Sequence, residues 1–82
     1  MIHIQYFGIL SDQLNCSKEE LIWAGGTSEQ LLIQLRERGE PWFSALQTDR
    51  VFKIAVNRVL KHETVEITDG DEVGILPPVT GG

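Results

Sequence analysis

Three short segments of the chain alternate apolar and polar side chains. The pattern covers residues 1–7, returns in residues 52–56 and appears again in residues 72–76. A period of two residues predicts strands that each turn one face to a core and the other face outward. We therefore expect a sheet with one covered face.

One helix is predicted to cover that face, over residues 28–38. Thr27 and Gln30 have the spacing of a capping box, in which each residue bonds the backbone N–H of the other at the start of a helix. A stripe of leucines follows at helical spacing, and Gly39 and Pro41 then supply a stop signal. This helix is the main one that the sequence predicts.

The remaining segments complete an α+β plan. Residues 21–24 predict a second strand, which forms a hairpin with the first strand across residues 8–20, a connection rich in polar side chains. Residues 65–67 predict a short edge strand, and residues 68–71 carry an Asp-Gly turn signal. At 82 residues the chain has room for one domain, residues 1–82.

Charge and composition disfavour several classes of protein. Seven Lys and Arg against twelve Asp and Glu give a net charge of −5, which opposes the phosphate contacts that dominate nucleic-acid binding. One cysteine and two histidines offer neither a disulfide nor a zinc ligand set, so no metal is expected. The sequence has no apolar run of about 20 residues and no signal-peptide pattern. We expect a cytoplasmic protein without nucleic-acid or membrane partners.

The last six residues, 77–82, are expected to form a flexible tail. They read Pro77, Pro78, Val79, Thr80, Gly81 and Gly82. Two prolines fix an extended course away from the body, and two glycines can thread a channel too narrow for other residues. Fully extended, such a tail reaches roughly 20 Å. It therefore predicts an arm that presents the terminal carboxylate to a partner, although a frayed end is the simpler alternative.

Two large apolar side chains are out of phase with the buried faces of their strands, and a third lies just past a strand. Phe7 and Leu76 fall on the side opposite the core, and Leu60 follows the third strand. Together they predict a small apolar patch near the root of the tail. Ordinary edge or loop contacts are the alternative for these residues.

Four segments give the chain a resemblance to a known family. They are Phe7, Ala-Val-Asn at residues 55–57, Asp-Gly-Asp-Glu-Val at residues 69–73, and Pro-Pro-Val-Thr-Gly-Gly at residues 77–82. Over its whole length the chain resembles the MoaD-like small subunits of molybdopterin synthase, which are sulfur carriers. The resemblance implies a ubiquitin-like β-grasp fold, with a mixed sheet and one main helix packed on one face.

The resemblance also implies a reaction cycle centred on Gly82. An adenylyltransferase of the ubiquitin-activating type would consume ATP to form a glycyl adenylate there, and a sulfurtransferase would convert it to a thiocarboxylate, a 1-thioglycine. The large subunit, in a heterotetramer of two small and two large chains, would use the sulfur on cyclic pyranopterin monophosphate in molybdenum cofactor biosynthesis. This chain would donate sulfur without catalysing the step and would bind no cofactor stably. Phe7, Leu60 and Leu76 match the family's docking positions.

The chain departs from that pattern at two places, which leaves the choice of partner open. Ser11-Asp12 stands where many members have an Arg-Glu pair, and Leu76 stands where many have an aromatic residue. Alternatives are a sulfur carrier for thiamine synthesis or tRNA thiolation, or a ubiquitin-like protein modifier. The Pro-Pro-Val-Thr spacer favours the molybdopterin branch.

Other residues that could carry chemistry have simpler interpretations. Cys16 lies in the predicted connection with no basic neighbour closer than Lys18, which favours an incidental thiol. His3 and His62 form no recognisable catalytic set and are expected to be solvated. The two tryptophans are expected to pack in or beside the core.

Overall fold

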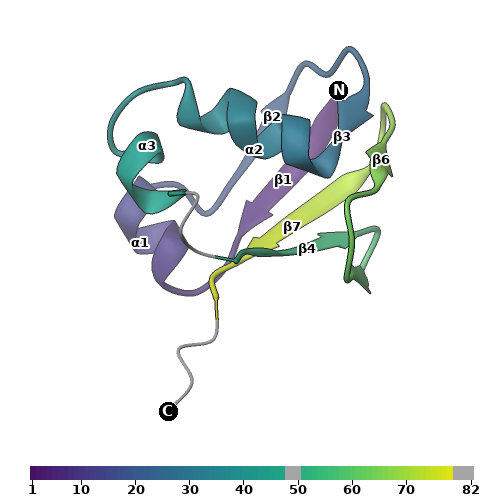
Figure 1. The fold of residues 1–82 in the computed structure, drawn as a ribbon. Helices are drawn as coiled ribbons and strands as arrows, with labels where there is room; N and C mark the ends of the chain where they lie inside the picture. The colour runs from purple at the N-terminus through teal and green to yellow at the C-terminus, as the bar shows by residue number, and fades with distance from the viewer. Residues whose placement is uncertain (48–50, 79–82) are drawn as a thin grey trace.

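A five-stranded mixed sheet forms the centre of the computed structural model, which describes residues 1–47 and 51–78 (Figure 1). In sheet order the strands are β2 (Lys18–Leu21), β1 (Ile2–Tyr6), β7 (Glu72–Leu76), β4 (Lys53–Val56) and β5 (Val59–Lys61). The central pair, β1 and β7, is parallel, and the other neighbours are antiparallel. The first and last strands of the chain therefore lie side by side in the middle of the sheet.

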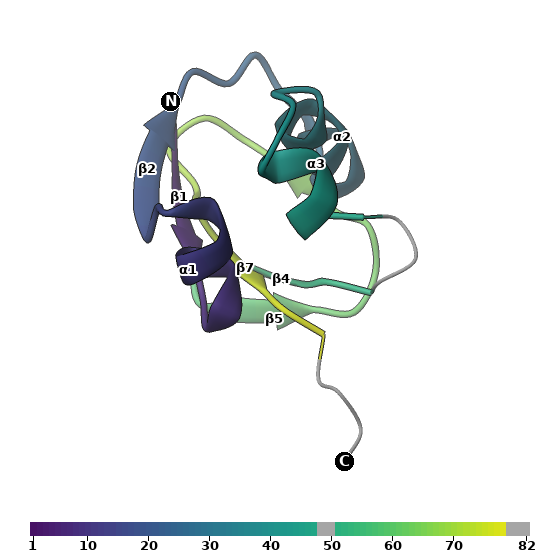
Figure 2. The ribbon, with the colours of Figure 1, turned by 90° about the vertical axis from the view of Figure 1, so that its left-hand side faces the viewer.

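Helices cover one face of this sheet, and the sheet curves around them (Figure 2). The helices are α1 (Ile9–Leu14), α2 (Ser28–Arg36) and α3 (Trp42–Ala45). Along β1 buried and exposed residues alternate, and Val73 and Ile75 of β7 are buried in the same way. These side chains share one core with Leu31 and Leu35 of α2. The predicted α+β arrangement, with one main helix over one sheet face, is confirmed.

The start of α2 forms through the predicted capping box. The Gln30 N–H donates to Thr27 Oγ1 at 3.2 Å, and the Thr27 N–H donates to Gln30 Oε1 at 2.8 Å. Both bonds satisfy backbone donors that a helix start leaves without partners. The helix ends at Arg36, slightly earlier than predicted.

Residues 8–20 are more ordered than the sequence interpretation allowed. They hold α1, whose buried Leu10 and Leu14 lie one helical turn apart, and most of β2. The strand was predicted at residues 21–24, but it begins at Lys18 and ends at Leu21. It pairs antiparallel with β1, so the predicted hairpin partners are correct while their bounds are not.

Trp23 explains why the strand does not continue through the segment predicted for it, residues 21–24. Its side chain turns into the core, and its indole N–H donates to the Ile67 carbonyl oxygen at 2.8 Å. Ile67 belongs to β6 (Glu66–Ile67), which pairs with β3 (Gly26–Thr27) in a separate two-stranded sheet. The predicted short strand at residues 65–67 therefore exists, but it does not extend the main sheet.

Two further elements were not predicted from the sequence. One is the short helix α3, and the other is β5, which pairs with β4 through a two-residue turn at Asn57 and Arg58. Leu60, predicted just past the third strand, therefore lies within a strand of its own. No helix in residues 1–47 and 51–78 is long and apolar enough to cross a membrane.

Candidate functional site

The tail leaves the body where the ends of β1 and β7 meet. The Phe7 N–H donates to the Ile75 carbonyl oxygen at 3.0 Å. This hydrogen bond extends the parallel pairing of β1 and β7 almost to the start of the tail. Gly8 then adopts a φ of +57°, and a β-carbon on it would lie 3.3 Å from Cγ of Pro77. A glycine here accepts both the left-handed backbone and the close approach of the proline ring. The first residue of the tail is thus packed against the end of β1.

The structure describes only the first two of the six residues of the predicted arm. Pro77 and Pro78 are half-buried at the end of β7. Val79, Thr80, Gly81 and Gly82 lie outside the described residues, so the prediction that they form an arm stays a prediction.

An apolar row crosses the outer face of the sheet beside the tail root. Phe7 remains 38% exposed, and its ring lies over Gly74, where an added β-carbon would come within 2.9 Å of Phe7 Cε2. Gly74 pairs with Ala55 and Ala55 pairs with Leu60, which is 43% exposed. Opposed residues in paired strands share a face, so these side chains form one row. The outward positions predicted for Phe7 and Leu60 are confirmed.

Leu76 completes what we call the docking face, defined as Phe7, Ala55, Leu60, Gly74 and Leu76. Its position two residues after Gly74 places it on the same side of β7, and it is half-buried. A shallow groove of about 760 Å³ runs along this side of the sheet. Charged side chains border the apolar part of the groove: Lys18, Glu20, Arg58 and Glu72. Whether the face binds a partner stays a prediction.

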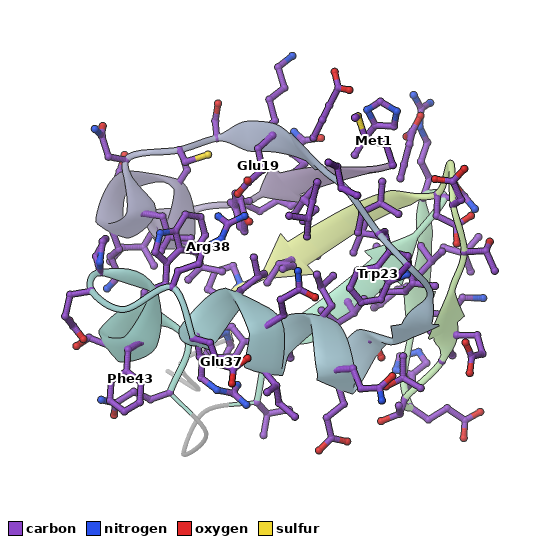
Figure 3. All side chains as sticks on the ribbon, turned by 90° about the horizontal axis from the view of Figure 1, so that it is seen from above. Met1, Glu19, Trp23, Glu37, Arg38 and Phe43 are labelled. Atoms are coloured by element: carbon purple, nitrogen blue, oxygen red, sulfur yellow. The ribbon has the colours of Figure 1, made fainter. Side chains whose placement is uncertain are left out.

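On the opposite side of β1 lies a group that the sequence analysis missed, which we call the Glu19 cluster: Tyr6, Glu19, Arg38 and Trp42. The Tyr6 hydroxyl donates to Glu19 Oε2 at 2.7 Å, and Arg38 donates to both carboxylate oxygens at 2.9 Å. Figure 3 shows the Glu19 and Arg38 side chains pointing toward one another. The guanidinium lies 4.4 Å from the centre of the Trp42 ring, which meets the Tyr6 ring edge-on.

The cluster changes how its members titrate. Partial burial alone raises the pKa of the Glu19 carboxyl, but the hydrogen bonds from Arg38 and Tyr6 and the charge of Arg38 outweigh it, so that pKa lies below its usual value. Burial, followed by the bond to Glu19, raises the pKa of Tyr6. Glu19 is therefore a carboxylate and Tyr6 a neutral phenol at neutral pH. The cluster joins β1, β2, the end of α2 and α3.

Of the remaining candidates, His3 lines the groove, whereas Cys16 and His62 do not. Cys16 is half-buried, and its thiol donates to the Lys18 carbonyl oxygen at 3.6 Å. Burial and then the Glu19 carboxylate raise the pKa of Cys16, which disfavours a reactive thiolate. His3 and His62 are exposed, as predicted. Within residues 1–47 and 51–78, no three side chains of His, Cys, Asp or Glu gather as a metal would require.

Chemically, this arrangement favours binding and delivery. The described outer surface offers an apolar face next to a proline-stiffened segment that leads to the chain's end. Such a face can dock a partner while the end enters that partner's site.

Comparison with known proteins places this geometry in a family context. The model of the ThiS family matches residues 4–82. Two relatives, each named molybdopterin synthase sulfur carrier subunit, align over 82 residues with 100% coverage of both chains. The one from Escherichia coli is 32% identical and the one from Haemophilus influenzae is 27% identical.

Two solved structures share the fold of this chain. A putative molybdopterin converting factor, subunit 1, from Pyrococcus furiosus superposes with a TM-score of 0.72 at 26% identity, covering 95% of this chain and 97% of that one. SAMP1 from Haloferax volcanii gives a TM-score of 0.71 at 18% identity, covering 99% and 98%. The second likeness bears on the fold alone. Both confirm the predicted ubiquitin-like β-grasp fold.

Proposed function

The chain belongs to the ThiS family, and we propose that it is the sulfur carrier subunit of a molybdopterin synthase. The observation that carries the proposal is the end-to-end match to relatives with that name, which includes the terminal glycines. The docking face at the tail root supports it, because a carrier must hold its partner while its end reaches into the partner's site. A large synthase subunit is the partner that this role requires.

The chemistry would begin at the Gly82 carboxylate. A free carboxylate is a poor acyl electrophile, so a partner adenylyltransferase would first use ATP to form the glycyl adenylate. A sulfurtransferase would then supply the sulfur that displaces AMP, which leaves a thiocarboxylate at the terminus. None of these steps draws on a side chain of the carrier itself.

The delivery step would depend on the two parts of the molecule described above. The docking face would fix the body on the large subunit, and Pro77 and Pro78 would direct the tail toward the cyclic pyranopterin monophosphate bound there. Holding a reactive group close to its target removes much of the entropic barrier to reaction. We place this cycle in the cytoplasm.

Removal or extension of the terminus tests the proposal. A chain without Gly82 should form no thiocarboxylate, because the carboxylate withdraws by about 3.5 Å while reaction geometry tolerates only about 1 Å. A residue appended after Gly82 should have the same effect. Gly81→Ile should strongly reduce thiocarboxylate formation, since a β-branched side chain would have to pass a channel sized for glycine.

The measurement is intact-mass analysis after incubation with the activating enzyme, ATP and a sulfur source, followed by a molybdopterin assay with the large subunit. Circular dichroism serves as the control, because each variant should fold as the wild type does. If the chain lacking Gly82 still forms a thiocarboxylate and supports normal molybdopterin yield, the proposal is wrong. Conjugates of the wild type to many lysines, in place of a thiocarboxylate, would indicate a protein modifier.

A further inference from the structure

The turn between β4 and β5 has an unusual residue at its second position. Val56 pairs with Val59, so Asn57 and Arg58 alone form the loop, with φ values of +50° and +69°. A two-residue hairpin with both φ angles positive is a type I′ turn, in which the second position strongly favours glycine. A side chain at that φ meets steric opposition that glycine avoids.

Asn57 is explained by its hydrogen bonds. Its N–H donates to the Glu72 carbonyl oxygen at 2.8 Å, and its side-chain oxygen accepts from the Glu72 N–H at 3.0 Å. Its amide nitrogen donates to Asp71 Oδ1 at 3.0 Å. Asparagine also tolerates the left-handed backbone well. The first position of the turn therefore serves the fold.

Arg58 has no comparable role in the fold. Its side chain is 88% exposed, and its Nε lies 3.7 Å from Glu72 Oε2, whose own side chain is 60% exposed. Ion pairs between two exposed side chains contribute little to stability. The backbone cost at this position is therefore not offset by the contacts that the guanidinium makes within the molecule.

The position of Arg58 suggests what offsets the cost. Arg58 lines the same groove as Phe7, Gly74 and Ala55 of the docking face. When a partner covers that apolar row, the guanidinium comes to lie at the border of a dry interface, where a charged hydrogen bond is stronger than in water. A planar guanidinium matches a carboxylate with two parallel hydrogen bonds.

We propose that Arg58 is a specificity-determining residue of the docking face, which pairs with a carboxylate on the large synthase subunit. The inference rests on the proposed function and adds to it a chemical requirement on the partner's surface. The chain has a net charge of −5, so a cation at this border is locally distinct. It favours a partner with an acidic group opposite Arg58 and disfavours one with a basic group there. The turn thus gives up some stability for recognition.

Two substitutions separate the backbone from the charge. Arg58→Gln keeps the β-carbon and removes the charge, so the melting temperature should stay the same while affinity for the large subunit falls roughly tenfold. Arg58→Gly removes the steric cost as well, so affinity should fall equally while the melting temperature holds or rises. In both variants, added salt should weaken binding less than it weakens binding of the wild type.

Asn15→Gly is the matched control. Asn15 also has a positive φ, +52°, at the end of α1, but it does not line the groove. Its substitution should leave affinity and salt dependence unchanged. The measurements are thermal melts by circular dichroism and titration calorimetry of each full-length variant against the large subunit at two salt concentrations.

The outcomes distinguish this inference from the proposed function. If the wild type binds and both Arg58 variants bind with the same affinity and salt dependence, Arg58 plays no part in recognition and only this inference is overturned. If the wild type neither binds the large subunit nor forms a thiocarboxylate, the proposed function falls, and this inference falls with it.

Discussion

Tyr6 and Phe7 are neighbours in sequence, but they lead into two regions of opposite character. Tyr6 enters the Glu19 cluster, where hydroxyl, carboxylate and guanidinium satisfy one another. No buried side-chain nitrogen or oxygen lacks a hydrogen bond within the described residues. Phe7 enters the docking face, where large apolar side chains stay partly in water. The inner region is explained by stability, whereas the outer one costs stability and, under the proposed function, would serve binding.

The largest expected effect comes from placing a charge on the outer region. Phe7→Asp and Leu76→Asp should each weaken association with the large subunit by more than about 2 kcal/mol, because an interface anchor is lost and a carboxylate is buried in its place. The loss of folding stability, measured by the melting temperature, should be smaller than this loss of binding free energy. Titration calorimetry alongside circular dichroism melts measures both quantities.

Ile22→Asp is the matched control for these substitutions. Ile22 is 81% exposed just after β2 and does not line the groove, so its variant should bind normally. The comparison between the two regions breaks down if Phe7→Asp and Leu76→Asp both unfold and bind only in proportion to their folded fraction. Both side chains would then belong to the core.

A smaller effect, on stability alone, is expected from the inner region. Glu19→Gln should lower the free energy of unfolding at pH 7 by about 1–2 kcal/mol, since bonds to a charged group are replaced by weaker ones and the pair is partly open to solvent. Affinity for the large subunit should not change. Urea unfolding followed by fluorescence measures the loss.

The pH dependence of that loss sharpens the assignment. The folded-state pKa of Glu19 lies below its unfolded value, so its contribution is present in full above the unfolded pKa and disappears as pH falls through the folded one. The gap between wild type and Glu19→Gln should therefore be constant near neutral pH and shrink below pH 4.5, the ordinary value for this carboxyl. A gap that stays constant down to pH 3 would contradict the charged role of Glu19.

The smallest expected effect is at Cys16. Cys16→Ser should leave thiocarboxylate formation and molybdopterin yield unchanged, because the proposed chemistry uses the terminus and no side-chain thiol. Since Cys16 packs against the edge of the core, the variant should lose less than about 1 kcal/mol of stability. Loss of activity in a folded Cys16→Ser protein would show that the thiol takes part.

Local patterns predicted much of the fold. The capping box at Thr27 gave the start of α2, and alternation gave β7 from Glu72 to Leu76 without error. The same alternation placed Phe7 on the outer side of the sheet. These signals succeed because each depends on neighbours within a few residues in the chain.

The failures have physical reasons at particular residues. Arg58 occupies a position where glycine would have signalled a turn, and this concealed the hairpin of β4 and β5. Leu10 and Leu14 are a helical pair in a polar segment, too short to outweigh its loop-like composition. The Glu19 cluster joins residues from separate elements, and no local pattern in the sequence brings Tyr6, Glu19 and Arg38 together.

The parallel pairing of β1 with β7 has a consequence for how the molecule assembles. Almost the whole chain separates these central strands, so their contact closes a very long loop and carries a large entropic cost. Folds dominated by such pairings form slowly. The row across Phe7 and Gly74 and the contact of Gly8 with Pro77 exist only after this closure. A partner that binds these contacts can bind only the fully folded chain. Under the proposed function, a partly folded chain would therefore not receive sulfur at its terminus.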